Sequence, residues 1–152
     1  YDKIHLFAPN GERELWDPGD AYTVVRLPGM TLGLLNCNDL RFPEQTRALR
    51  LQGGCNALAV VAWWPCRRDA IWRTLLRARA IENNCWVLGC CVAGSEVPEE
   101  RFAGAGNYLF DPAGDPVPTP DDRTYDLDLA APPKGAVDTR ADFVDITQVR
   151  VF

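Results

Sequence analysis

Cys37 is the residue of this sequence whose setting best suits nucleophilic chemistry. It follows the apolar run 31–36 and is succeeded at once by polar and turn-forming residues, among them Asn38, Asp39 and Pro43. A strand that ends in a tight turn exposes a nucleophile at the edge of a sheet, and the N–H groups that follow it point to where an oxyanion would form. The pattern therefore favours acyl transfer by a cysteine thiolate.

The remaining five cysteines are interpreted as small buried side chains. The sequence has no CxxC pair and a single histidine, so we predict no metal site and no cofactor. A disulfide framework is not expected either, because a chain of this size can build a sufficient core and nothing at its start resembles a secretory signal. These five residues are Cys55, Cys66, Cys85, Cys90 and Cys91.

Four blocks of the sequence, in order, resemble the nitrilase superfamily of carbon-nitrogen hydrolases, and its amidases and omega-amidases in particular. Residues 37–44, CNDLRFPE, are similar to the cysteine signature of that family, and residues 1–7, YDKIHLF, are similar to its lysine motif. Two further family blocks match residues 64–65, WP, and residues 78–83, ARAIEN. The match is looser between residues 89 and 143.

The resemblance implies a glutamate-lysine-cysteine triad in which Cys37 forms a thioester-type acyl-enzyme with a small linear amide or a nitrile. Lys3 and the backbone N–H of Asn38 would stabilise the tetrahedral oxyanion. Glu12 has the spacing of the family's second glutamate, and it would position Lys3 or the hydrolytic water. The implied activity is hydrolysis of a non-peptide carbon-nitrogen bond.

Two adjacent tryptophans, Trp63 and Trp64, are expected to line the substrate pocket. Trp63 stands where omega-amidase-like sequences usually carry a small polar side chain. A bulky indole there would reshape the pocket toward apolar groups. This departure leaves open which amide or nitrile is cleaved.

The general-base glutamate of the family has no counterpart in the sequence. Only Asp2 precedes Lys3 among the acidic residues, and it is adjacent to Lys3 and so poorly placed. We therefore interpret residues 1–152 as a carbon-nitrogen hydrolase domain without its N-terminal half, inactive on its own. Two alternatives stay open, namely a non-catalytic assembly module and a cysteine-histidine hydrolase built on Cys37 and His5.

The elements that must position these residues alternate between strands and helices. Strands are expected over residues 22–27, 31–36, 56–62, 85–91, 107–110 and 124–129, with 56–62 and 85–91 buried on both faces. Helices are expected from Pro43 to the Gly53-Gly54 pair and over residues 69–83. This alternation indicates an α/β layered domain.

The resemblance implies a nitrilase-like α-β-β-α sandwich, of which this chain would be the C-terminal portion. We expect the chain to supply part of both sheets and to leave an apolar sheet face or edge uncovered. In the loop after Cys37, Asp39 and Arg41 are expected to form a structural ion pair.

Assembly is predicted from the helix over 69–83 and from a C-terminal tail at about 130–152. Ile71, Leu75 and Ala78 form the predicted core stripe of that helix, which leaves Trp72 and Leu76 as additional apolar surface. Nitrilase-like proteins pair through this region, so the resemblance implies a homodimer or a higher even oligomer. Trp72 and the tail are expected to be buried against the neighbouring copy.

Composition limits the partners of the protein. Its 152 residues are 47% hydrophobic and 24% charged, which is typical of one globular domain. The net charge of -5 argues against nucleic acid and against an anionic membrane surface. The longest apolar stretch, residues 57–65, is too short to span a bilayer. We therefore expect a cytoplasmic protein that acts on a small molecule.

Overall fold

The computed structural model describes residues 1–94, 106–121, 124–127, 129 and 136–137. Its described strands form one five-stranded sheet in the order β1-β2-β3-β4-β5. Strands β2, β3 and β4 are parallel, and β1 and β5 pair antiparallel to the two edges of this central unit. The strands are β1 (Val24–Leu27), β2 (Met30–Asn36), β3 (Ala57–Ala62), β4 (Trp86–Cys91) and β5 (Tyr108–Phe110).

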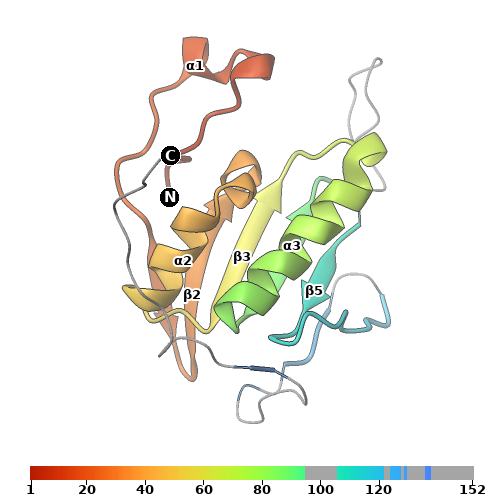
Figure 1. Cartoon of the computed structure of the whole chain (residues 1–152). Coiled ribbons are helices and arrows are strands. Elements are labelled where there is room, and N and C mark those ends of the chain that lie inside the picture. The colour runs from red at the N-terminus through yellow and green to blue at the C-terminus, as the bar shows by residue number, and fades with distance from the viewer. Residues whose placement is uncertain (95–105, 122–123, 128, 130–135, 138–152) are drawn as a thin grey trace, which may run out of the picture.

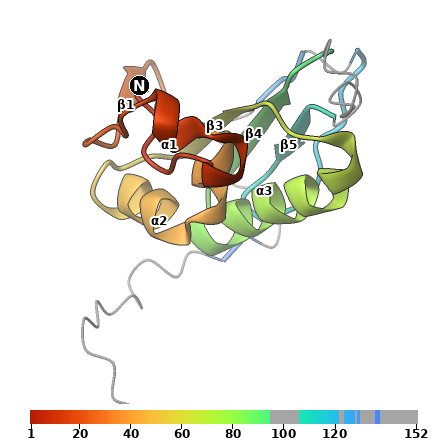
Figure 2. The same cartoon turned by 90° about the horizontal axis from the view of Figure 1, so that it is seen from above.

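The helices connect these strands in a β-α-β-α-β succession. Helix α2 begins with Pro43 at its first turn, where the missing N–H costs nothing, and α3 ends at Asn84 in the left-handed conformation. Both α2 and α3 lie on the same face of the sheet (Figures 1 and 2). The helices are η1 (Ala8–Asn10), α1 (Glu12–Leu15), η2 (Cys37–Arg41), α2 (Pro43–Leu51), η3 (Cys66–Arg68) and α3 (Asp69–Asn83).

The core lies between the sheet and these two helices. Leu35, Leu58, Val60 and Val87 alternate along their strands with side chains on the other face, and all four are buried. Gly89 on β4 allows the closest approach of a helix, because an added Cβ would lie 2.4 Å from Leu76 Cδ1. Burial of aliphatic side chains on one face of each strand is what stabilises this layer.

Helix α3 is rotated relative to the sequence expectation. Trp72 is 0% exposed and packs in the core, whereas Ile71 is 44% exposed. The predicted core stripe is therefore wrong at Ile71, whereas Leu75 is partly buried and packs against the core. The prediction that Trp72 contributes to an interface between copies is also wrong, because its side chain is already buried within the chain. The large indole fills the space above Gly89, with its Cζ2 atom only 2.7 Å from where a Cβ of that residue would lie.

The opposite face of the sheet is apolar and exposed. By strand register, Val61 and Leu88 belong to this face with Val25 and Leu27, and all four are exposed, Val61 by 55%. The expectation of an uncovered apolar face is confirmed for the described residues. Two expectations are wrong: β3 and β4 are not buried on both faces, and the described strands contribute to one sheet rather than two.

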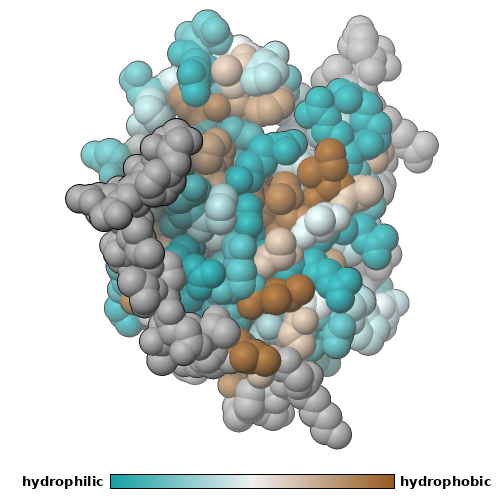
Figure 3. Space-filling view, viewed as in Figure 1, coloured by the Kyte–Doolittle hydropathy of each residue, from teal (hydrophilic) through white to brown (hydrophobic). Residues whose placement is uncertain are grey.

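Figure 3 looks onto the helix-covered face of the molecule. A diagonal row of hydrophobic residues lies over α3, and the exposed side chains of Ile71 and Ile81 belong to this helix. Hydrophilic residues surround the row over most of the remaining described surface in this view. Helix α3 therefore keeps apolar surface, although not the residue that the sequence suggested.

Several smaller expectations have mixed outcomes. Residues 124–127 and 129 are not in a strand, so the strand expected over 124–129 is wrong where the chain is described. Of the five cysteines expected to be buried, Cys90 is exposed and Cys66 is partly exposed. Most of the tail at about 130–152 lies outside the described residues. Within the described part of the chain, no helix is long and apolar enough to cross a membrane.

Candidate active site

Cys37 lies at the sharp turn between β2 and η2. Its backbone φ angle is 51°, in the left-handed region that side chains other than glycine rarely adopt. Such strain is characteristic of a nucleophile held at the end of a strand. The thiol Sγ donates a long hydrogen bond of 3.7 Å to the carbonyl oxygen of Trp63, which follows β3. The turn predicted from the sequence is therefore confirmed, with the thiol directed toward the next loop.

Burial and charge act in opposite directions on the Cys37 thiol. Desolvation raises the pKa of Cys37 above its ordinary value and is the larger effect, whereas attraction to the Lys3 ammonium lowers it. The carboxylate of Glu12 opposes Lys3 and raises the pKa again. The thiol is therefore mainly protonated at neutral pH, and its use as a nucleophile requires a base.

Lys3 and Glu12 form an ion pair that the surrounding chain partly shields. Lys3 Nζ lies 2.8 Å from Glu12 Oε1 and 2.6 Å from Glu12 Oε2. The backbone N–H of Phe7 donates to the same Oε2 at 2.6 Å, which fixes the carboxylate relative to the loop between the two charged residues. The side chains of Lys3 and Glu12 are only 10% and 21% exposed. Two of the residues predicted from the sequence are thus brought together.

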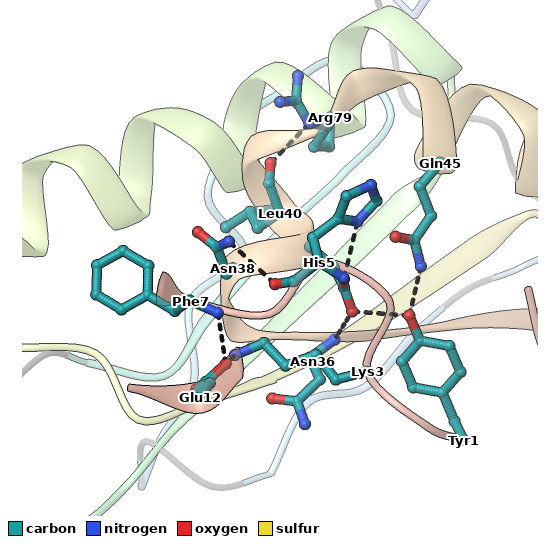
Figure 4. A network of polar contacts seen from close by, with 11 residues as sticks. Tyr1, Lys3, His5, Phe7, Glu12, Asn36, Asn38, Leu40, Gln45 and Arg79 are labelled. Atoms are coloured by element: carbon teal, nitrogen blue, oxygen red, sulfur yellow. Dashed lines mark hydrogen bonds and ion pairs between the residues drawn. The ribbon is translucent and has the colours of Figure 1, made fainter. Parts of the chain in front are cut away.

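Asp39, a buried carboxylate, lies two residues after Cys37. It accepts hydrogen bonds from residues 1–7, the lysine segment, which contains Lys3. It accepts hydrogen bonds from the Tyr1 hydroxyl at 2.7 Å and from the backbone N–H of His5 at 2.8 Å. His5 Nδ1 lies 3.0 Å from the same oxygen that the His5 N–H contacts. The backbone N–H of Asn36 also donates to Asp39, and Figure 4 shows the labelled residues Tyr1, His5 and Asn36 close together. The Asp39-Arg41 ion pair expected from the sequence is replaced by these contacts.

Asn38 and His5 are both engaged in holding the loop. The Asn38 side-chain amide donates to the carbonyl oxygen of His5 at 3.0 Å. The His5 ring stacks on Phe42 with a centroid distance of 3.8 Å and an interplanar angle of 9°. Both side chains therefore have structural partners that join residues 1–7 to the turn at Cys37.

The predicted site residues line a single cavity of about 800 Å³. Trp63 is 51% exposed, whereas Trp64 is 3% exposed and packs against Trp72. The two tryptophans therefore differ in role, since only Trp63 presents much of its ring. The lining includes Lys3, Glu12, Cys37, Asn38, Trp63 and Trp64.

Sequence reasoning missed a group of arginines on the wall of this cavity. Arg41 and Arg68 line it, and both contact Trp64: the Arg41 guanidinium lies 4.8 Å from the ring centroid, and the Arg68 carbonyl accepts from the indole N–H. Arg67 and the carboxylate of Asp17 also line the cavity. The WP block at 64–65 pointed to this wall, but no role was predicted from the sequence for the two arginines that follow it. Among the described residues, no cluster of His, Cys, Asp and Glu could hold a metal ion.

The sequence of this chain is similar to those of known carbon-nitrogen hydrolases. The family model described as carbon-nitrogen hydrolase matches residues 1–132. The 2-oxoglutaramate amidase of Bacillus subtilis strain 168 is 40% identical over 114 residues, which cover 75% of this chain and 43% of the relative. The chain thus spans less than half the length of this relative.

Solved structures with the same fold are also similar in sequence. XC1258 from Xanthomonas campestris, a CN-hydrolase superfamily protein with an arsenic adduct in its active site, is 34% identical with a TM-score of 0.67. The match covers 76% of this chain and 45% of that one. A glutamate-to-glutamine mutant of an amidase from Nesterenkonia sp. AN1, in which acrylamide has added to the active-site cysteine, is 30% identical with a TM-score of 0.67. That match covers 77% of this chain and 45% of the amidase.

Proposed function

The chain belongs to the carbon-nitrogen hydrolase family, and from this premise we propose that the protein hydrolyses a small linear amide with Cys37 as its nucleophile. The observation that carries the proposal is the left-handed turn at Cys37, whose thiol lies in one cavity with the Lys3-Glu12 ion pair. A strained turn, a nearby cation and an enclosing cavity are three of the parts that cysteine acyl transfer uses, and a general base is the fourth.

The reaction follows two displacement steps. A general base removes the Cys37 proton, the sulfur attacks the amide carbon, and the oxyanion forms beside Lys3. The carbon-nitrogen bond then breaks, and ammonia leaves with the proton that the base returns. Water, deprotonated by the base, attacks the resulting thioester, which releases the carboxylic acid and the thiol. Lys3 lowers the energy of both tetrahedral intermediates, because its charge is already in place when they form.

Glu12 serves in this mechanism to hold Lys3 rather than to act as the general base. Both of its carboxylate oxygens contact the ammonium, and one also accepts the Phe7 N–H. Asp17, which also lines the cavity, is exposed and lies on the segment after α1. We propose that the base belongs to a part of the family domain outside these 152 residues, and that the chain alone does not turn over.

The substrate proposal rests on the relatives and on the cavity. The Bacillus subtilis relative is a 2-oxoglutaramate amidase, and a mutant of an amidase of the same fold carries acrylamide, a small amide, on its active-site cysteine. A cavity of about 800 Å³ accommodates a small linear amide. Arg41 and Arg68 on its wall favour an amide whose far end carries negative charge.

Ammonia release from a panel of small linear amides tests the proposed function. It is to be measured for the natural polypeptide that contains this chain and for the 152-residue chain alone. We expect release by the former and none by the latter. The absence of release in both, across neutral and anionic amides, would favour the non-catalytic assembly module instead.

Assembly forms a separate part of the proposal. We propose a homodimer or a higher even oligomer in which the exposed apolar surface of α3 contacts a second copy. Ile71 and Ile81 supply this surface, in place of the buried Trp72. Sedimentation at micromolar concentration tests the proposal, because Ile71→Asp should shift the protein toward monomer. A monomeric protein before any substitution would contradict it.

A further inference from the structure

We propose that Asp39 is a positioning residue that fixes Lys3 relative to the Cys37 thiol. The inference rests on the proposed function only in giving Lys3 and Cys37 their roles, since the geometry itself joins the two segments. Asp39 lies in η2, two residues after Cys37, and its side chain is fully buried. A buried carboxylate is costly unless donors surround it, so each of its contacts constrains the chain that supplies the donor.

Both oxygens of the Asp39 carboxylate receive donors from two separate segments. Oδ2 accepts the Tyr1 hydroxyl at 2.7 Å and the backbone N–H of Asn36 at 2.9 Å. Oδ1 accepts the backbone N–H of His5 at 2.8 Å and lies 3.0 Å from His5 Nδ1. One carboxylate therefore joins the end of β2, just before the nucleophile, to residues on both sides of Lys3.

Lys3 lies between Tyr1 and His5, which are both bonded to Asp39, so these contacts restrict where Lys3 can lie. Residues 1–7 form no helix or strand, so no ladder of backbone hydrogen bonds fixes their position. The Tyr1 hydroxyl is itself held by Gln45, whose side-chain amide donates to it at 2.7 Å from α2. Desolvation of the hydroxyl, and next its hydrogen bond to Asp39, raise the pKa of Tyr1, which favours the protonated hydroxyl that donates to Asp39.

Asn38 also ties residues 1–7 to the turn at Cys37, but through one neutral hydrogen bond, so it supplements Asp39. The Lys3 carbonyl accepts the backbone N–H of Gly19, and the His5 carbonyl accepts the Asn38 amide. Glu12 holds the Lys3 ammonium, but it belongs to the same N-terminal segment and does not tie that segment to β2. Asp39 is the charged group among the described residues that bonds directly to both the lysine segment and the turn at Cys37.

Replacement of Asp39 by asparagine distinguishes a positioning role from a direct electrostatic effect, because the two change the Cys37 pKa in opposite directions. Asp39→Asn keeps the shape but replaces one acceptor oxygen with an amide that faces donors. Loss of a nearby negative charge alone would lower the Cys37 pKa. Displacement of Lys3 would instead raise it, because Lys3 is the group whose charge lowers the pKa of this thiol.

The test is a double-mutant cycle read from the pH dependence of Cys37 alkylation by iodoacetamide, with peptide mapping to identify the labelled cysteine. The proteins are the unchanged chain, Asp39→Asn, Lys3→Ala and the double variant. We expect both single variants to raise the alkylation midpoint, Asp39→Asn by about half a pH unit, equivalent to an about threefold slower reaction at neutral pH. The double variant should match Lys3→Ala alone, because Asp39 acts through Lys3.

Asp69→Asn is the matched control for this cycle. Asp69 also accepts a tyrosine hydroxyl, that of Tyr108 at 3.0 Å, but it lies at the start of α3 and does not line the cavity. It should leave the midpoint unchanged. Where Asp39→Asn does not fold, as judged by thermal melting, Tyr1→Phe removes one donor with less disturbance and should give a smaller shift in the same direction.

A lowered midpoint in Asp39→Asn, or a shift that persists undiminished in the Lys3→Ala background, would overturn the proposal. So would a midpoint that none of the Asp39 and Tyr1 variants changes. The alkylation readout requires no turnover, so its outcome is independent of the ammonia-release assay. Failure of the positioning role and failure of the amidase function can therefore be told apart.

Discussion

Lys3 and Glu12 face each other in a two-point contact, with Nζ 2.8 Å from one carboxylate oxygen and 2.6 Å from the other. Because the pair is largely withdrawn from solvent, salt screens it less than an ion pair on the open surface. The Phe7 N–H completes the contact by donating to Glu12. The ammonium therefore has a fixed place beside the cavity, which suits the oxyanion-stabilising role proposed for it.

Lys3→Ala is expected to remove most turnover of the active protein, whereas His5→Ala should keep much of it. The first variant removes the cation beside the nucleophile, which corresponds to a loss of about 10²-fold or more in kcat. The second removes a ring that already stacks on Phe42 and contacts Asp39. Steady-state kinetics with a small amide compare the two. The reverse ranking would support a cysteine-histidine hydrolase.

Alkylation of Cys37 should increase with pH along a curve displaced upward from that of a free thiol. Burial raises the Cys37 pKa, so the folded protein holds the thiol proton to higher pH than the unfolded chain does. Alkylation therefore becomes fast only at a pH above the ordinary pKa range of cysteine. The contribution of the thiol to the free energy of unfolding falls as the pH rises from the unfolded pKa through the folded one. Labelling rates across a pH series, in native buffer and in denaturant, measure the displacement. A native curve at lower pH would contradict it.

Gly89→Ala is expected to destabilise the fold by about 1–3 kcal/mol, the usual cost of overpacking a core. An added methyl group would lie 2.4 Å from Leu76 Cδ1 and 2.7 Å from Trp72 Cζ2. Gly94→Ala is a matched control, because nothing lies within 4 Å of its added Cβ. Urea unfolding of the three proteins provides the measurement. Equal midpoints for Gly89→Ala and Gly94→Ala would mean that α3 does not pack on β4 as described.

Local signals made much of the fold predictable. Pro43 and the Gly53-Gly54 pair bracket α2, which spans Pro43–Leu51, and the apolar run before Cys37 is β2. The face of α3 was not predictable in the same way, since Ile71 and Trp72 are both apolar and neighbours in sequence. Tertiary packing above Gly89 decides which of the two is buried.

The candidate site was also predictable only in part from the sequence. The motifs around Lys3 and Cys37 identified residues that prove to line one cavity. The role of Asp39 could not be read from them, because its partners Tyr1 and His5 are 38 and 34 residues away in sequence. A carboxylate in a polar loop is ordinarily a surface residue, and only the folded chain shows that this one is buried.

Cys37 is proposed to carry the acyl group during amide hydrolysis. Acid quenching of the active protein during turnover of a small amide, followed by peptide mass spectrometry, tests it most directly. We expect an acyl mass increment on the peptide that contains Cys37. In Cys37→Ala we expect neither the adduct nor ammonia release, with an unchanged thermal melt. Ammonia release that survives in a folded Cys37→Ala variant, or an acyl group found on Cys66 or Cys90 instead, would contradict it.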